Sequence, residues 1–100
     1  MDAGDEELDA NTVRKAYLIT YSQADLKRFP SRGSFANCVV EAFLYQECRA
    51  KVVHWVCRME PHKDSGKHYH FAIKLSEDKR WKPTKKYLLK RHRISVHFSN

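Results

Sequence analysis

The 100-residue sequence has no long apolar run and few cysteines. No stretch approaches the roughly 20 apolar residues of a membrane span, and the N-terminus lacks the basic-then-apolar order of a signal peptide. The number of cysteines is odd and none are in CxxC spacing, so Cys38, Cys48 and Cys57 indicate neither a disulfide framework nor a cysteine zinc site. We expect one small intracellular domain, in the nucleus or cytoplasm, that is monomeric or weakly oligomeric and has no membrane partner.

Acidic residues are scarce outside the N-terminus. Five of the twelve acids lie within MDAGDEELD, so the net charge of +7 rises to +12 when these nine residues are left out. We expect residues 1–13 to be a disordered acidic tail and residues 14–100 to be the folded domain. The segment 79–93, KRWKPTKKYLLKRHR, has eight Lys or Arg and no acid. Its charge and interleaved aromatics predict a polyanion partner, and a solvated basic helix is the alternative.

The succession of strand and helix patterns predicts an α+β fold. Strands are expected at 16–22, 51–60, 68–75 and 94–98, and helices at 35–49 and 84–92. Ser31 and Ser34 precede the first helix in a loop typical of an N-cap. This order is that of a ferredoxin-like split βαβ fold, an antiparallel sheet with helices on one face and an open functional face.

Strand alternation places three potential metal ligands on the open face. In an antiparallel hairpin of 51–60 and 68–75, Glu60, His68 and His70 point away from the helices. The face toward the helices takes the apolar residues Val53, Trp55, Cys57, Met59, Tyr69, Phe71, Ile73 and Leu75. Two imidazoles and a carboxylate can bind a divalent ion and leave positions open for water or a phosphate oxygen. The alternative is a polar sheet face with exposed histidines.

Two stretches carry a family resemblance. HYHFAIKL, residues 68–75, opens an apolar strand with histidine, an apolar residue and histidine, and it resembles the HUH motif of rolling-circle replication initiators. CRMEPHKDSGKHYH, residues 57–70, is similar to the version in replication-associated proteins of circular single-stranded DNA viruses and related transposons. YLITYSQ, residues 17–23, resembles the first motif of that family, with Ser22 in place of proline. The resemblance covers about residues 15–98.

The resemblance implies a metal-dependent endonuclease that nicks single-stranded DNA. In that family a tyrosine attacks a phosphodiester and stays bonded to the 5′ phosphate. Carried over by residue, Glu60, His68 and His70 would bind the metal, Mg²⁺ or Mn²⁺, and Thr20 and Tyr21 would help to hold the DNA. The basic residues that we expect to contact DNA are Arg58, Lys85, Lys86 and Arg91.

The third motif of the family is a helix with Tyr-x-x-Lys, which matches Tyr87-Leu-Leu-Lys90 here. Tyr87 and Lys90 would share a helical face, where nearby ammonium groups would lower the tyrosine pKa and assist attack. In the family, however, this helix follows the strand that corresponds to 94–98. Tyr87 is therefore either the nucleophile or a packing residue. If the usual C-terminal tyrosine helix is missing, we expect the chain to be a fragment, a truncated gene product or a domesticated remnant, which could bind metal and DNA without cutting.

Two other functions stay open. One is a non-catalytic module that binds single-stranded nucleic acid through the sheet face and the segment 79–93. The other is a small interaction domain whose histidines are incidental. His54 shares the open face, and His92 and His97 could meet phosphate, although we expect these histidines to be solvated.

Overall fold

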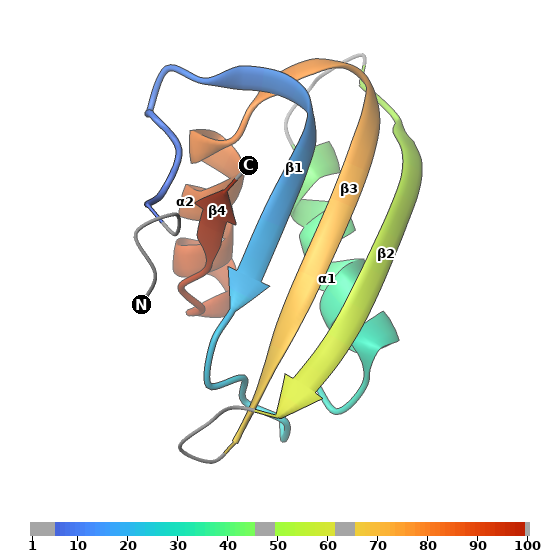
Figure 1. Cartoon of the computed structure of the whole chain (residues 1–100), viewed down its shortest axis with the longest axis vertical. Coiled ribbons are helices and arrows are strands. Elements are labelled where there is room, and N and C mark those ends of the chain that lie inside the picture. The colour runs from blue at the N-terminus through green and yellow to red at the C-terminus, as the bar shows by residue number, and fades with distance from the viewer. Residues whose placement is uncertain (1–5, 46–49, 62–65, 100) are drawn as a thin grey trace.

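The computed structural model describes residues 6–45, 50–61 and 66–99. In chain order the elements are β1 (Val13–Tyr21), α1 (Arg32–Leu44), β2 (Val52–Pro61), β3 (Lys67–Arg80), α2 (Lys82–His92) and β4 (His97–Ser99). The strands form one antiparallel sheet in the order β2-β3-β1-β4 (Figure 1). This confirms the α+β class, and the arrangement is compatible with a ferredoxin-like fold.

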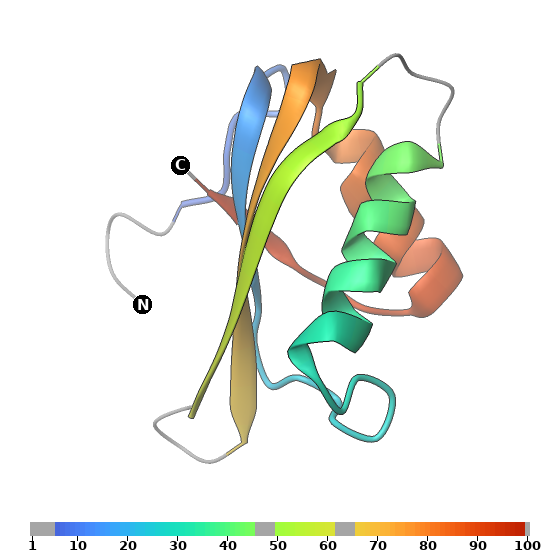
Figure 2. The same ribbon diagram turned by 90° about the vertical axis from the view of Figure 1, so that its right-hand side faces the viewer.

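Both helices pack on the same face of the sheet (Figure 2). Within the described residues, the opposite face is covered by no helix, so side chains that point to that side meet solvent. Neither described helix is long and apolar enough to cross a membrane. The sheet therefore has one face that builds the core and one that is free to carry a site.

Helix α1 begins at Arg32, three residues earlier than expected, because Ser31 and Ser34 form a capping box. Ser31 Oγ accepts the Ser34 N–H at 3.2 Å, and Ser34 Oγ accepts the Ser31 N–H at 3.1 Å. The residues on one face of α1 are buried: Phe35, Cys38, Val39, Ala42 and Phe43. The helix ends at Leu44, and residues 46–49 of the expected helix lie outside the described residues.

An aromatic cluster around Phe35 fixes which face of the sheet points to the helices. Phe35 is fully buried and stacks on Tyr69 with ring centroids 5.1 Å apart, and it meets Phe71 edge-on at 6.2 Å. Tyr69 and Phe71 alternate with His68 and His70 along β3. Because successive side chains of a strand point to opposite faces, packing of the two aromatic rings directs both histidines to the open face.

The two described cysteines are core residues. Cys38 and Cys57 are free and buried, and burial raises the pKa of each thiol to about 11. A thiol with such a high pKa is a poor nucleophile at neutral pH, so both residues act as small packing groups. Cys48 lies outside the described residues.

The apolar face of β2 is less covered than the sequence predicted. Trp55 stacks on Phe71, on the helix side of the sheet, but keeps 38% of its surface exposed, and Met59 keeps 42%. The reason is that β2 is an edge strand, so its side chains have neighbours on one flank only. Val53 is 58% exposed because the register shifts between Val52 and His54, which breaks the alternation there.

The second half of the fold differs from expectation at its boundaries. Helix α2 begins at Lys82 because Pro83 is tolerated in the first helical turn. It ends at His92, and the C-cap residue Arg93 takes a left-handed conformation with φ of 59°. Ile94 and Val96 are buried, but the pairing with β1 begins only at His97, so β4 is shorter than the strand expected at 94–98.

The segment 6–12, which we expected to belong to a disordered tail, lies against β4 and the start of α2. Leu8 donates its N–H to the Phe98 carbonyl at 3.1 Å, and the Trp81 indole N–H donates to the Asp9 carbonyl at 2.9 Å. These partners order the segment because they satisfy backbone groups at the sheet edge. Residues 1–5 of the expected tail lie outside the described residues.

Candidate metal centre on the open sheet face

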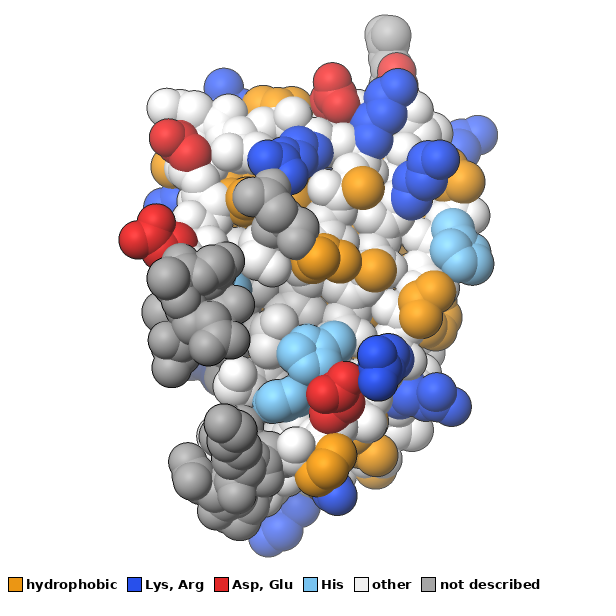
Figure 3. Space-filling model, in the orientation of Figure 1, with side chains coloured by type: hydrophobic (Ala, Val, Ile, Leu, Met, Phe, Trp, Pro, Cys, Tyr) orange, Lys and Arg blue, Asp and Glu red, His pale blue; other side chains and the backbone are white. Residues whose placement is uncertain are grey.

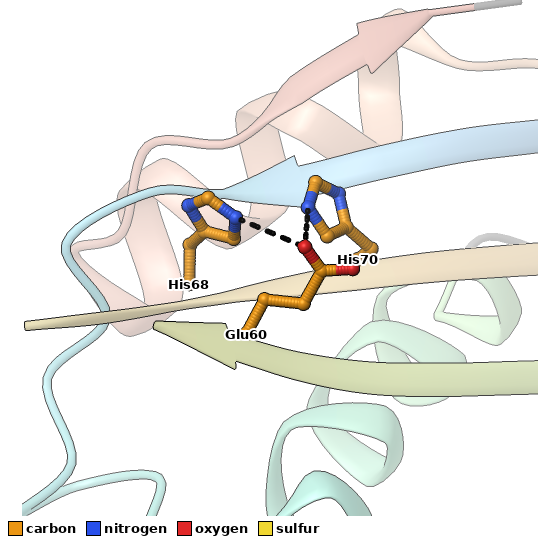
Figure 4. A group of neighbouring side chains, drawn as sticks. All are labelled: Glu60, His68 and His70. Carbon is orange, nitrogen blue, oxygen red and sulfur yellow. Dashed lines mark ion pairs between the residues drawn. The ribbon is translucent and has the colours of Figure 1, made fainter. Parts of the chain in front are cut away.

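The register of β2 and β3 brings Glu60, His68 and His70 together. Glu60 pairs directly with His68, and Arg58 pairs with His70. Directly paired residues of antiparallel strands have Cβ atoms about 5 Å apart, and same-face neighbours follow at every second residue. The convergence that alternation predicted for the three side chains is therefore present on the open face (Figure 4).

The three side chains offer their ligand atoms to one small region. His68 Nε2 lies 4.0 Å and His70 Nε2 lies 3.8 Å from Glu60 Oε2. The imidazole centroids are 4.5 Å apart, with the rings inclined by 76°. One ligand atom from each residue lies within 4.8 Å of the other two, so Glu60, His68 and His70 could hold a metal ion. Ligands at about 2.1 Å from an ion lie roughly 3.0–3.4 Å apart, so modest side-chain movements would close this set.

Thr20 orients one of these imidazoles. It pairs with His70 across β1 and β3, and its Oγ1 lies 3.4 Å from His70 Nδ1. A neutral imidazole has one donor and one acceptor nitrogen, so a partner at Nδ1 leaves Nε2 to face Glu60. A metal-binding histidine is commonly held in this way by a partner at its other nitrogen. We expected Thr20 to contact DNA, and the structure places it as the partner of His70.

Arg58 adds a positive charge beside the carboxylate. Its Nη2 lies 3.1 Å from Glu60 Oε1, while 72% of its side chain is exposed. A guanidinium has five N–H donors, so Arg58 can pair with Glu60 and still offer donors to an anion from solvent. This position fits the DNA contact that the sequence predicted for Arg58.

His97 continues the same row, although the sequence reasoning named it only as a residue that could meet phosphate. The pairs Arg58 with His70, His70 with Thr20, and Thr20 with His97 form one line across all four strands. His97 therefore lies on the open face, two strands from His70. Its alternation with the buried Val96 and Phe98 was the signal that could have placed it there.

A shallow hollow continues the open face beyond the histidines. Its volume is about 330 Å³, and its lining includes Ala16 on β1 and Ala72 on β3, whose small side chains leave the space. Leu18 and Val56 add exposed apolar surface, at 44% and 49%. Ala72 follows His70 by two residues on the same face. Figure 3 shows this neighbourhood, with histidines and one acid grouped on the face and apolar side chains beside them.

Tyr21 does not lie on the open face, contrary to the DNA-contact role that the resemblance implied. It is 7% exposed, stacks on Phe35 with centroids 5.3 Å apart, and accepts the Asp25 N–H at its hydroxyl at 3.1 Å. Neighbouring residues of a strand point to opposite faces, so Thr20 and Tyr21 cannot both contact a ligand on one face. Tyr21 is a core residue.

Tyr87 and Lys90 lie on α2, in the helix layer and not beside the triad. The Tyr87 hydroxyl donates to Glu41 Oε2 on α1 at 3.1 Å, and its ring lies 4.3 Å from that of Tyr45. Desolvation and the hydrogen bond to the Glu41 carboxylate raise the pKa of Tyr87 above its ordinary value. We expected nearby ammonium groups to lower this pKa, but the charge that lowers it is that of Arg91, and desolvation together with the Glu41 carboxylate outweighs it. The sheet separates Tyr87 from Glu60, His68 and His70.

The basic run also lies on the helix side. Lys86 and Arg91 are exposed on α2, beside a groove of about 900 Å³ that Lys82, Lys90 and Tyr45 also line. Lys85, by contrast, is paired with Glu7, its Nζ lying 2.6 Å from the carboxylate. The basic residues expected to contact DNA therefore divide between two surfaces, with Arg58 beside the triad and the others on α2.

Comparison of the chain with protein-family models, with curated proteins and with solved structures finds no significant match. The resemblance of residues 17–23 and 57–70 to the HUH endonuclease domain therefore stays a prediction. The function has to be inferred from the chemistry of the open face.

Proposed function

We propose that the chain is a divalent-metal-dependent domain of the HUH nicking-endonuclease type, which acts on single-stranded DNA at the open sheet face. The observation that carries this proposal is the convergence of Glu60, His68 and His70 within 4.8 Å on a face that no described helix covers. A protein that needed the three residues only for stability would gain little from a carboxylate and two imidazoles at the surface.

The donor set suits Mg²⁺ or Mn²⁺ in a site that is open to substrate. One carboxylate and two imidazoles occupy three positions, and ions that prefer six ligands then keep further positions for water or a phosphate oxygen. When bound, the ion would supply Lewis-acid polarisation of a phosphodiester oxygen. The partial exposure of the three side chains, between 19% and 41%, leaves room for such a substrate.

The remaining residues of the face suit a single strand. Arg58 offers exposed guanidinium donors for a phosphate beside the triad. The hollow floored by Ala16 and Ala72 is apolar and flat enough to take the face of a base, and Arg14 and Lys74 line it with positive charge. Apolar surface for bases beside positive charge for the backbone is the general pattern of proteins that bind single strands.

The nucleophile is the part of the family mechanism that this chain does not bring to the triad. Tyr17, Tyr21 and Tyr69 are buried in the core, and Tyr45 and Tyr87 lie in the helix layer. Nicking at Glu60, His68 and His70 would therefore use water or a tyrosine from another polypeptide segment. In either case an oxygen bonds to phosphorus as the bond from phosphorus to the 3′ oxygen breaks, and the 3′ oxygen takes up a proton.

The position of Tyr87 also favours a second candidate function. A chain with the metal centre but without a tyrosine beside it would bind single-stranded DNA without cutting it. This non-catalytic module would use the same triad, the same Arg58 and the same hollow. The two candidates differ only in whether the phosphodiester is broken.

The deciding experiment mixes a labelled single-stranded oligonucleotide with the protein and Mn²⁺, and compares the wild type with a His68→Ala, His70→Ala double variant. Cleavage that needs Mn²⁺ and both histidines supports the nicking function, and covalent capture of the oligonucleotide would distinguish a tyrosine from water. Binding that needs both but gives no cleavage supports the second candidate. Binding that survives chelator and the double variant would overturn the metal role.

A matched control is available on the same sheet face. His54 is an exposed histidine of β2 outside the triad. The His54→Ala variant should keep the Mn²⁺ affinity of the wild type, whereas the double variant should lose it. An equal loss in both would show that Mn²⁺ binds to surface histidines without selectivity.

A further inference from the structure

Two hydrogen-bond donors, the Lys85 ammonium and the Phe98 N–H, and the His97 imidazole converge on the carboxylate of Glu7 at the outer edge of β4. The Lys85 ammonium lies 2.6 Å from both carboxylate oxygens. The Phe98 N–H donates to Glu7 Oε2 at 3.1 Å, and His97 Nδ1 lies 3.9 Å from the same oxygen. The site is open to solvent, since 28% of the Lys85 side chain and 35% of the His97 side chain are exposed.

This cluster has the composition of a phosphate site. An ammonium, an imidazole and a backbone N–H are the groups that proteins commonly direct at phosphate oxygens. Burial raises the pKa of Glu7. The hydrogen bonds from Lys85 and the Phe98 N–H and the charge of Lys85 lower the pKa by a larger amount, so the pKa of Glu7 is below its ordinary value. Glu7 is therefore a carboxylate near neutral pH, and its two oxygens lie where those of a phosphate would lie.

The cluster is connected to the metal centre by the sheet itself. His97 pairs with Thr20, and Thr20 pairs with His70, so His97 lies two strand spacings, about 10 Å, from the triad. A few nucleotides of an extended strand span such a distance. Lys85 belongs to α2, so the cluster also joins the open face to the exposed lysines of that helix around the edge of β4.

Glu7, whose carboxylate fills this cluster, comes from the most acidic part of the chain. Glu7 is one of the five acids among the first nine residues, and the segment 6–12 is held to the fold by the Leu8 and Trp81 hydrogen bonds described above. An acidic segment beside a site for a polyanion competes with it for the same cations. Displacement of Glu7 would free Lys85 and His97 together.

We propose that Lys85, His97 and the Phe98 N–H form a second phosphate-binding site for the nucleic acid strand, and that Glu7 occupies this site until a phosphate displaces it. The proposal rests on the proposed function for the identity of the strand, but the site itself needs no metal ion. A strand held at the triad would continue past Thr20 to His97 and turn toward α2, and the N-terminal segment would restrain binding.

The test compares Glu7→Gln with Glu6→Gln. Both variants remove one negative charge, but Glu6 is an exposed neighbour outside the cluster. Glu7→Gln should raise the affinity for a labelled single-stranded oligonucleotide about fivefold, which corresponds to about 1 kcal/mol. The slope of log affinity against log salt should steepen by about 0.7, the value for one added phosphate contact on a single strand. Equal effects of the two variants would overturn the proposal, because net charge alone would then explain them.

A metal-free arm separates this proposal from the proposed function. Inorganic phosphate is titrated into Glu7→Gln and Glu6→Gln, and the Phe98 amide and His97 ring resonances are followed by NMR. Both resonances should shift at lower phosphate concentration in Glu7→Gln, and adding Lys85→Met should remove the difference. Unchanged His68 and His70 resonances would show that the sheet stays folded. Identical titrations in the two single variants would overturn the phosphate site, whatever the outcome of the Mn²⁺ experiments.

Discussion

The Thr20 hydroxyl on β1 lies 3.4 Å from Nδ1 of His70 on β3, and this contact joins the central strand pair to the candidate metal centre. Because it engages Nδ1, the imidazole presents Nε2 to Glu60, at 3.8 Å. The orientation of one ligand is thus set by a residue that is not itself a ligand. The same register line continues to His97 at the edge of the sheet.

Replacing Thr20 by valine should weaken the metal centre without disturbing the sheet. Valine has nearly the shape of threonine and suits a strand, but it lacks the hydroxyl that holds His70. We expect the Mn²⁺ affinity to fall about tenfold, as is typical when the partner of a metal-binding histidine is removed. Calorimetric titration measures this loss, and Thr20→Ser should restore most of the affinity. Wild-type affinity in Thr20→Val would show that Thr20 does not orient His70.

Metal binding should stabilise the protein without being needed for folding. The core around Phe35 lies on the helix side, whereas the triad lies on the open face, so chelator should leave the circular dichroism spectrum unchanged. Mn²⁺ at about 100 times its Kd should stabilise the native state by about 2.7 kcal/mol, which raises Tm by roughly 10 °C. The His68→Ala, His70→Ala variant should show no rise. Unfolding by chelator, or an undiminished rise in that variant, would contradict this site.

The parts of the fold that follow from alternation and helical periodicity could be predicted from the sequence. The order of the elements, the buried face of α1 and the common face of Glu60, His68 and His70 depend on local patterns, which the core packing of Phe35 then enforces. Period-two alternation would also have excluded Tyr21 from the open face, since Thr20 already points there.

The remaining features depend on contacts between distant parts of the chain. Coverage of Trp55 is incomplete because β2 is an edge strand, which the sequence of β2 alone does not reveal. The pKa of Tyr87 is raised by desolvation and by the carboxylate of Glu41, which comes from another helix. The pairing of Glu7 with Lys85 joins residues 78 positions apart. The charge composition predicts an acidic N-terminus and a basic segment, but it does not predict that the two are in contact.

The ion pair of Glu7 should make stability depend on pH in the acid range. The pKa of Glu7 is lower in the folded protein than in the unfolded chain. Its contribution is therefore complete above the ordinary carboxyl pKa of about 4.3, and it disappears as the pH falls through the folded value. Urea unfolding should find Glu7→Gln about 1 kcal/mol less stable than the wild type near neutral pH, and equally stable in acid. Glu6→Gln should match the wild type at both, and a pH-independent deficit in Glu7→Gln would indicate lost packing instead.

Replacing Tyr87 by phenylalanine tests whether its hydroxyl, which lies in the helix layer, takes part in the chemistry of the open face. The hydroxyl donates to the Glu41 carboxylate on the far side of the sheet from Glu60 and His70, so Mn²⁺-dependent binding and any cleavage of single-stranded DNA should match the wild type. Loss of this solvent-exposed hydrogen bond should lower the unfolding free energy only slightly.

The matched variant Glu41→Gln tests the same hydrogen bond by changing its acceptor, the Glu41 carboxylate. Desolvation of Tyr87 would persist, but the charge that raises its pKa would be gone, so absorbance titration should find its tyrosinate forming at lower pH than in the wild type. Neither variant should change the Mn²⁺ affinity, because α2 packs on the face of the sheet opposite to the triad (Figure 2). If Tyr87→Phe abolished cleavage while binding persisted, the hydroxyl would have to reach the open face, and α2 would have to leave its packing against α1 during the reaction.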